Sequence, residues 1–226
     1  MGKLKIVGAG PGSPEYITPI AKETVQNAEI VIGAKRAINL FQDHIKGEAF
    51  PLTAKNLKKL LKHAVKSAKA GKNVVLLSTG DPGFSGLLRT FQNVAGKNVK
   101  VEVVPGVSSI QVCAARLRVS WDTSQLFTFH GGATSEERKK LTETLKKGKT
   151  VFLLPDNNSF APPDIAKFLI DQGIDRETPV GICENLTLSK ERIIISTLEG
   201  ILQENFDSLC VMTIVTDTRQ KDRVKF

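Results

Sequence analysis

Three loops rich in glycine and proline carry the residues whose types and spacing could do chemistry. They read GAGPGSP at 8–14, STGDPGFSG at 78–86 and VPGVSS at 104–109. Each follows an apolar run typical of a strand, and such loops let backbone N–H and C=O groups approach a ligand closely. One loop of this kind is an ordinary tight turn. Three in one half of the chain favour a ligand site, and a surface lined by backbone suits a neutral or zwitterionic nucleoside better than a triphosphate.

The first loop does not fit a dinucleotide-binding fingerprint. Gly8 and Gly10 match G-x-G-x-x-G, but Ser13 occupies the third glycine position. Pro11 also removes a backbone N–H that such a fold would present to a pyrophosphate. The acidic residue expected after the second strand is replaced by AKR at 34–36, and no Walker pattern occurs. The sequence therefore argues against nicotinamide cofactors and nucleoside triphosphates.

The remaining chemically active side chains are scattered. No Ser/His/Asp triad or Cys/His pair lies at a recognisable nucleophile elbow. The cysteines and histidines stand at Cys113, Cys183, Cys210, His44, His63 and His130. We expect no metal site, and we expect buried free thiols in a reducing cytoplasm. His130 is either a residue of a binding cleft or a satisfied histidine at a strand end.

A formal net charge of +9 calls for an explanation. Much of it lies in KNLKKLLKHAVKSAKAGKN at 55–73, where leucines recur at helical spacing and lysines fill the remaining face. Such a face is either simply solvated or attracts a polyanion, which could be nucleic acid or a small polycarboxylate. No aromatic-interleaved basic strand supports nucleic-acid binding. No apolar run approaches a membrane span, so we expect no membrane association.

The order of elements predicts an α/β fold with two domains. Strands at 3–8, 29–33, 73–78 and 99–104 alternate with helical patterns, which implies parallel pairing. One of these helices has Thr18 as its N-cap and Pro19 as its first residue. Strand-like runs at 126–131, 150–155, 179–184, 192–197 and 208–215 follow, with helices at 136–147 and 163–172, and predict a mixed sheet. We expect domains at 1–118 and 119–226, connected by RLRVSWDTSQ at 116–125.

These motifs resemble the tetrapyrrole methylase family. The resemblance is carried by VGAGPGSPEYIT at 7–18, GDPGFSG at 80–86 and PGVSS at 105–109. It continues through IGAKRAINLF at 32–41, FTFHGG at 127–132 and ICENLTLSKERI at 182–193, in order along nearly the whole chain. Within the family these segments are most similar to the branch that methylates C5 of a cobalt-precorrin during cobalamin biosynthesis.

The resemblance implies two α/β domains with a cleft between them that binds S-adenosyl-L-methionine in a folded form. Matched position by position, the cofactor-binding residues would be Pro11, Gly80, Asp81, Phe84, Ser108, Ser109, Leu154, Glu184 and Asn185. Asp81 also has a physical rationale, because a carboxylate near a sulfonium favours the cation. A structural role as a turn residue before Pro82 is nearly as well supported by the sequence.

The implied substrate is a cobalt-corrinoid bearing many carboxylates. Lys35, Arg36, Arg89 and Arg116 lie near expected loop or helix ends and could bind them. No catalytic acid or base is identified, and we expect catalysis by proximity, orientation and exclusion of water. The resemblance also implies a homodimer and a separate, decarboxylating C15-methyltransferase. Two alternatives stay open: a family member that methylates ribosomal RNA or a translation factor, and a non-catalytic basic module that binds nucleic acid.

Overall fold

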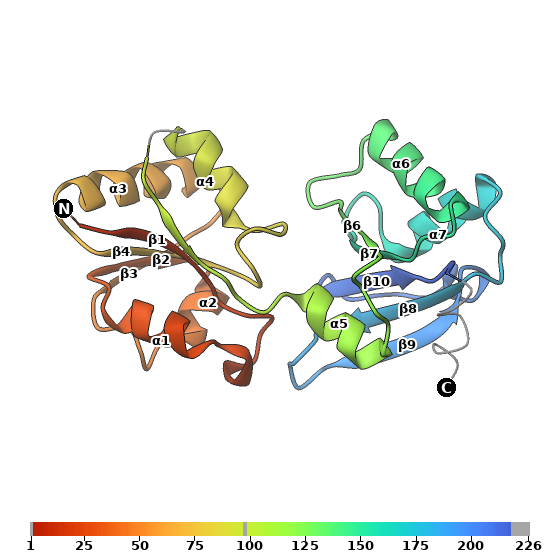
Figure 1. Ribbon diagram of the computed structural model, residues 1–226, viewed down its shortest axis with the longest axis horizontal. Helices are drawn as coiled ribbons and strands as arrows, with labels where there is room; N and C mark the ends of the chain where they lie inside the picture. Colours follow the sequence, from red (N-terminus) through yellow and green to blue (C-terminus); the bar gives the residue numbers. More distant parts are fainter. Residues whose placement is uncertain (1, 97–98, 218–226) are drawn as a thin grey trace. The chain divides into compact units, whose positions relative to one another are not determined.

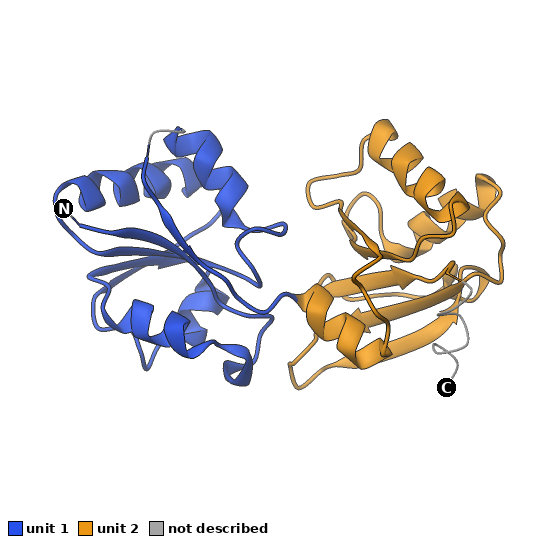
Figure 2. Cartoon of the chain, in the orientation of Figure 1, with its two compact units in different colours: residues 1–108 blue, residues 109–226 orange. Residues whose placement is uncertain are grey.

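The computed structural model describes residues 2–96 and 99–217. The chain divides into two compact units, residues 1–108 (unit 1) and 109–226 (unit 2), which Figure 2 shows in different colours. Each unit is built on its own five-stranded sheet. None of the helices in the described ranges is both long and apolar enough to cross a bilayer.

Unit 1 is a parallel sheet covered by helices on both faces (Figure 1). Its strand order is β3-β2-β4-β1-β5, and all four pairings are parallel. The strands are β1 (Leu4–Gly8), β2 (Ile30–Gly33), β3 (Glu48–Pro51), β4 (Val74–Ser78) and β5 (Glu102–Val104). The helices are η1 (Pro14–Tyr16), α1 (Pro19–Gln26), α2 (Lys35–Leu40), α3 (Leu57–Lys69) and α4 (Leu87–Ala95).

Local sequence explains how the helices of unit 1 begin and which face they bury. The hydroxyl of Thr18 accepts a hydrogen bond from Ala21 N and Pro19 is the first residue of α1, as expected. Helices α1 and α2 pack on one face of the sheet through Ala21 and Ala37, and α3 and α4 pack on the other through Leu61 and Phe91. The central strands β1, β2 and β4 are therefore buried on both faces, which leaves the sheet edges and loops to carry function.

Unit 2 contains a mixed sheet, as expected. Its strand order is β6-β7-β10-β8-β9, and only β6 and β7 pair in parallel. The strands are β6 (Gln125–Thr128), β7 (Val151–Leu154), β8 (Pro179–Glu184), β9 (Arg192–Thr197) and β10 (Cys210–Ile214). The helices are α5 (Ser109–Leu117), α6 (Ser135–Lys146), α7 (Pro162–Asp171) and η2 (Glu199–Ile201).

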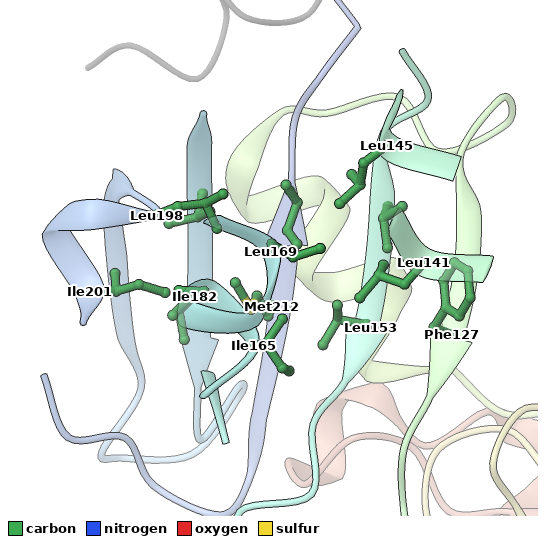
Figure 3. Packing of buried hydrophobic residues seen from close by; sticks show 14 of the residues in the cluster. Phe127, Leu141, Leu145, Leu153, Ile165, Leu169, Ile182, Leu198, Ile201 and Met212 are labelled. Carbon is green, nitrogen blue, oxygen red and sulfur yellow. The ribbon is translucent and has the colours of Figure 1, made fainter. Parts of the chain in front are cut away.

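The main core of unit 2 lies between its sheet and helices α6 and α7. Leu141 and Leu145 of α6 and Ile165 and Leu169 of α7 are buried against the sheet. Figure 3 shows these side chains pointing toward residues of the central strands, such as Met212. Alternate residues of the same strands face the opposite side of the sheet, where α5 packs.

Helix α5 belongs to unit 2, although the expected domain boundary placed it in the first domain. Its Cys113 Sγ lies 3.4 Å from Cys183 Sγ of β8 and 3.4 Å from Thr213 Oγ1 of β10. Leu117 packs so closely on Gly181 that an added Cβ there would lie 2.6 Å from Leu117 Cδ1. The division therefore falls at 108/109, about ten residues before the expected boundary, and the segment 116–125 lies within unit 2.

Candidate functional site

The three glycine-rich loops of the sequence converge at the carboxyl edge of the unit 1 sheet. They follow β4, β1 and β5, which are neighbours in the strand order. Gly8 ends β1 and lies directly against Gly106, so that an added Cβ on Gly8 would sit 2.5 Å from Gly106 Cα. An added Cβ on Gly106 would sit 2.4 Å from Gly80 O. Only glycine permits this approach, which brings the three loops into one cluster (the loop cluster: residues 8–14, 79–86 and 105–108).

Gly80 connects two of these loops and leaves one side of its backbone open. Its N–H donates to Gly10 O at 2.9 Å, and the two residues form an isolated antiparallel bridge. Its φ of +64° is a left-handed conformation that favours glycine. An added Cβ would meet nothing nearer than Ser108 Cα at 3.8 Å, so space adjoins the backbone at this point.

Asp81 anchors the loop cluster through both of its carboxylate oxygens. Gly83 N–H donates to Oδ1 at 2.8 Å and Gly106 N–H donates to Oδ2 at 3.1 Å. The first bond closes a turn and the second ties the β4 loop to the β5 loop. The structural role that the sequence offered for Asp81 is thus present, and its charge also lies at the edge where the loops meet.

The other expected cofactor residues of unit 1 lie in the same cluster. Pro11 and Ser108 are buried, and Phe84 is half-buried. Ser78 Oγ accepts from Leu87 N–H at 3.0 Å and so fixes the start of α4 after the β4 loop. Ser109 lies on the other side of the division, as the first residue of α5.

The basic residues of unit 1 that we expect to bind the substrate carboxylates are exposed. Lys35 and Arg36 are the first two residues of α2, directly after β2, and therefore stand at the same edge of the sheet as the loop cluster. Arg89 lies in the first turn of α4, which begins at that edge. Arg116, the fourth basic residue expected to bind the substrate, belongs to α5 of unit 2.

In unit 2, Leu154 and Glu184 end β7 and β8 at one edge of the sheet, because both strands run antiparallel to β10 between them. Glu184 is 2% exposed. Its Oε2 accepts from Arg192 Nε, and its Oε1 accepts from Asp207 N–H. This ion pair raises the pKa of Arg192. Sequence reasoning named Glu184 as a contact residue, whereas the structure commits its carboxylate to positioning the segment before β10.

The loop that follows Glu184 adopts left-handed backbone at two positions. Asn185 has a φ of +49° and donates its side-chain amide to Asp207 Oδ2. Thr187 has a φ of +68°, which is costly for a β-branched residue. Its N–H donates to Glu191 Oε2 at 2.6 Å, and Arg116 Nε donates to Glu191 Oε1 at 2.7 Å. Arg116 is therefore engaged by Glu191, and its bond lowers the pKa of that carboxyl.

His130 is exposed beside the second aspartate-anchored turn of the chain. Asp156, just after β7, accepts from Asn158 N–H at 2.9 Å and from Gly131 and Gly132 N–H at 3.0 Å each. The backbone donors, Asn158 first, hold the pKa of Asp156 below its usual range. Within the described residues no three His, Cys, Asp or Glu side chains gather as a metal site.

Sequence reasoning did not predict that Gly8 and Gly106 allow the loops to pack against each other, or that Ser78 fixes the start of α4. Glycines after strands were a visible signal, but their mutual contact depends on the strand order β4-β1-β5. Glu191 and Asp207 gave no signal, because each acts on a residue that is distant in the sequence or on the loop backbone.

Comparisons with known proteins agree with this architecture. A probable cobalt-precorrin-7 C(5)-methyltransferase of Methanocaldococcus jannaschii is 41% identical over 209 residues, covering 92% of this chain and 95% of that protein. The solved precorrin-6Y methylase of Archaeoglobus fulgidus is 25% identical with a TM-score of 0.75, covering 96% of this chain and all of that one.

A third protein shares the fold. The uroporphyrin-III C-methyltransferase of Thermus thermophilus, solved in complex with S-adenosyl homocysteine, has a TM-score of 0.73 at 24% identity and covers 96% of this chain and 99% of that one. The family model described as tetrapyrrole (corrin/porphyrin) methylases matches residues 3–202. The chain belongs to the tetrapyrrole methylase family.

Proposed function

We propose that this protein transfers a methyl group from S-adenosyl-L-methionine to C5 of cobalt-precorrin-7. The observation that carries the proposal is the 41% identity to the Methanocaldococcus jannaschii relative over nearly the full length of both chains. The loop cluster of unit 1 is the candidate site for the methionine part of the cofactor.

The described residues fit such a cofactor chemically. The open side of Gly80 offers space next to backbone groups, which suits the zwitterionic amino-acid part of the cofactor. The Asp81 carboxylate at the same cluster favours a cation such as a sulfonium. Pro11, Phe84 and Ser108 complete this set in unit 1.

In unit 2 the adenosine-side residues would be Ser109, Leu154 and Asn185. Asn185, which has a left-handed backbone, donates its side-chain amide to Asp207 Oδ2, and the N–H of Asp207 donates to Glu184 Oε1. We therefore assign Glu184 a positioning role, through the segment before β10, rather than direct contact with the cofactor.

The bound cofactor supplies the electrophilic methyl group, so the protein need not generate one. The chain's own contribution is to hold the methyl carbon in line with a nucleophilic ring carbon and to exclude water. Such positioning is worth about 7–11 kcal/mol of a barrier. The rigid Gly8–Gly106 contact and the two bonds to Asp81 serve this purpose, because they fix the loops before any ligand arrives.

The acetate and propionate groups of the substrate need cationic partners. Lys35 and Arg36 are the best placed in unit 1, since both are exposed at the edge that carries the loop cluster. Arg89 is exposed on α4, and Arg116 of α5 is also exposed, with Glu191 as one of its partners. Both are further candidates for binding substrate carboxylates.

We further propose a cytoplasmic homodimer that works in sequence with a separate C15-methyltransferase. Light scattering on the purified chain tests the dimer directly. A particle of one 24.6 kDa chain at micromolar concentration would contradict it.

The deciding experiment has two stages. Calorimetric titration with S-adenosylhomocysteine should show saturable binding to one site per chain, with NAD as the control ligand that does not bind. Incubation with cobalt-precorrin-7 and methyl-labelled cofactor should then place one labelled methyl group at C5. Labelling at another ring carbon would reassign the substrate. If the protein binds S-adenosylhomocysteine but methylates no tetrapyrrole, a macromolecular substrate is favoured. Methylation of ribosomal RNA and of translation factors can then be assayed.

A further inference from the structure

The net positive charge of this protein belongs to one of its two units. Unit 1 contains 16 of the 32 lysines and arginines but only seven of the 23 aspartates and glutamates, so it carries the entire net charge of +9. Unit 2 contains 16 of each kind and is formally neutral. An asymmetry of this size creates a field around unit 1 alone.

Helix α3 is the centre of that charge. Its lysines Lys58, Lys59, Lys62, Lys66 and Lys69 (the α3 lysine row) are all exposed, and the helix contains no acidic residue. Among the residues that the structure describes, none of the five forms an ion pair. Lys55 and Lys72 extend the row beyond both ends of the helix.

Helix α6 of unit 2 shows that lysine-rich helices in this chain need not be unbalanced. It carries Lys139, Lys140 and Lys146 together with three glutamates, and Lys139 pairs with Glu143 at 3.9 Å. Of these two lysine-rich helices, α3 contains no acidic residue, whereas the lysines of α6 are balanced by glutamates.

The placement of α3 connects the row to the loop cluster. The helix follows β3 and precedes β4 of a parallel sheet, so it begins at the carboxyl edge and runs back to the amino edge (Figure 1). Its first lysines therefore stand at the end of unit 1 that carries the glycine-rich loops, together with the exposed Lys35 and Arg36.

We propose that the α3 lysine row guides a small polycarboxylate substrate toward the carboxyl edge of unit 1 by long-range attraction. The inference rests on the proposed function, because a corrin precursor is such a polyanion. A nucleic acid fits the surface less well. The row has no stacking platform, since Trp121 of unit 2 is the one aromatic among the large hydrophobic side chains exposed in residues 2–96 and 99–217.

The test compares two matched variants of the full-length protein. One replaces the five lysines of the α3 row by glutamine. The control replaces five exposed lysines of unit 2, Lys139, Lys140, Lys146, Lys147 and Lys149, by glutamine. Both variants lose the same net charge, and neither set belongs to the proposed binding residues. Circular dichroism and S-adenosylhomocysteine affinity confirm that each variant is folded and retains its cofactor site.

The probe is uroporphyrin III, a stable and fluorescent octacarboxylate, and the readout is its association rate by stopped-flow quenching. The α3 variant should associate about tenfold more slowly than the wild type at low salt, and the control should match the wild type. The difference should vanish near 1 M salt, where the Debye length is about 3 Å. With cobalt-precorrin-7, kcat/KM should follow the same pattern while kcat stays unchanged.

Equal association rates for the two variants, a salt-independent difference, or no binding of uroporphyrin III to the wild type would each overturn the proposal. So would loss of binding to single-stranded RNA in the α3 variant with an unchanged rate for uroporphyrin III. The proposed function is judged separately: methylation of C5 by both variants at high salt would support it even if guidance by α3 fails.

Discussion

Gly8 and Gly106 allow the loops that follow three strands to pack backbone against backbone, where side chains would clash. Their backbones lie so close that a Cβ on either residue would overlap the other. Gly80 differs, because it combines a left-handed φ with room for an added methyl group, which would meet only Ser108 Cα, at 3.8 Å. The same residue type thus permits close packing at two positions and borders a candidate ligand site at the third.

Replacing Gly80 by alanine should separate these roles. The left-handed φ of +64° makes the change cost about 1–2 kcal/mol of unfolding free energy, and the methyl group projects into the space beside the loop cluster. S-adenosylhomocysteine affinity should fall at least about tenfold, which calorimetry measures.

Gly71→Ala is the matched control for backbone strain. Gly71 also lies in unit 1 with a positive φ, +98°, and an added Cβ there meets nothing within 4 Å. The control should lose similar stability and keep its affinity. Equal affinity losses in the two variants would mean that strain, and not occupation of the site, explains the effect at Gly80.

Acidic residues at both sheet edges act first as anchors of backbone. Asp81, Asp156 and Glu184 each accept hydrogen bonds from N–H groups of neighbouring loops. A carboxylate in such a turn looks the same in a sequence as one that contacts a ligand. Sequence reasoning named Asp81 and Glu184 as cofactor-binding residues, while the hydrogen-bond partners of their carboxylates emerge only from the fold.

At the scale of elements, the sequence predicted what local patterns encode. The N-cap Thr18, the apolar runs of β1 and β4, and the amphipathic α3 all depend on neighbours in the chain. Strand β3 was missed because it is an exposed edge strand that ends in Pro51 and has no apolar alternation. The boundary was misplaced because the apolar face of α5 does not reveal which sheet it packs against.

The bond between Arg116 and Glu191 joins α5 to the loop before β9, and it gives the stability of unit 2 a pH dependence. Arg116 lowers the pKa of Glu191, so the contribution is fully present above the ordinary carboxyl pKa and is lost as pH falls through the lower, folded value. Because Arg116 is 38% exposed, the contribution should be about 1 kcal/mol or less.

Denaturant unfolding of wild type and Glu191→Gln should therefore differ near pH 7 and converge as the pH falls below the ordinary glutamate pKa and through the lower, folded value. Glu177→Gln provides the control for loss of one negative charge. Glu177 is exposed before β8 and forms no ion pair within the described part of the chain. A difference that persists unchanged to pH 3 would show that Glu191 acts through packing rather than through its charge.

At the scale of the whole molecule, two units of similar size carry very different charge. The balanced composition of unit 2 lets its ion pairs form locally, as between Lys167 and Asp171 at 2.7 Å. Unit 1 has a single ion pair among its described residues, Lys5 with Glu102 at 3.0 Å. Its excess of like charges must therefore repel one another in the folded state.

This repulsion predicts that salt stabilises one unit and not the other. Raising ionic strength from about 0.01 M to about 0.1 M shortens the Debye length from about 30 Å to about 10 Å and screens the α3 lysine row. The opening free energy of unit 1 should rise by roughly 1 kcal/mol, read from hydrogen exchange of β1 and β4, while β7 and β10 of unit 2 stay constant. Replacing the five lysines of the α3 lysine row by glutamine should abolish most of this salt-dependent rise in the opening free energy of unit 1. An equal gain in both units would instead trace the effect to general salt stabilisation, because unit 2 has no net charge to screen.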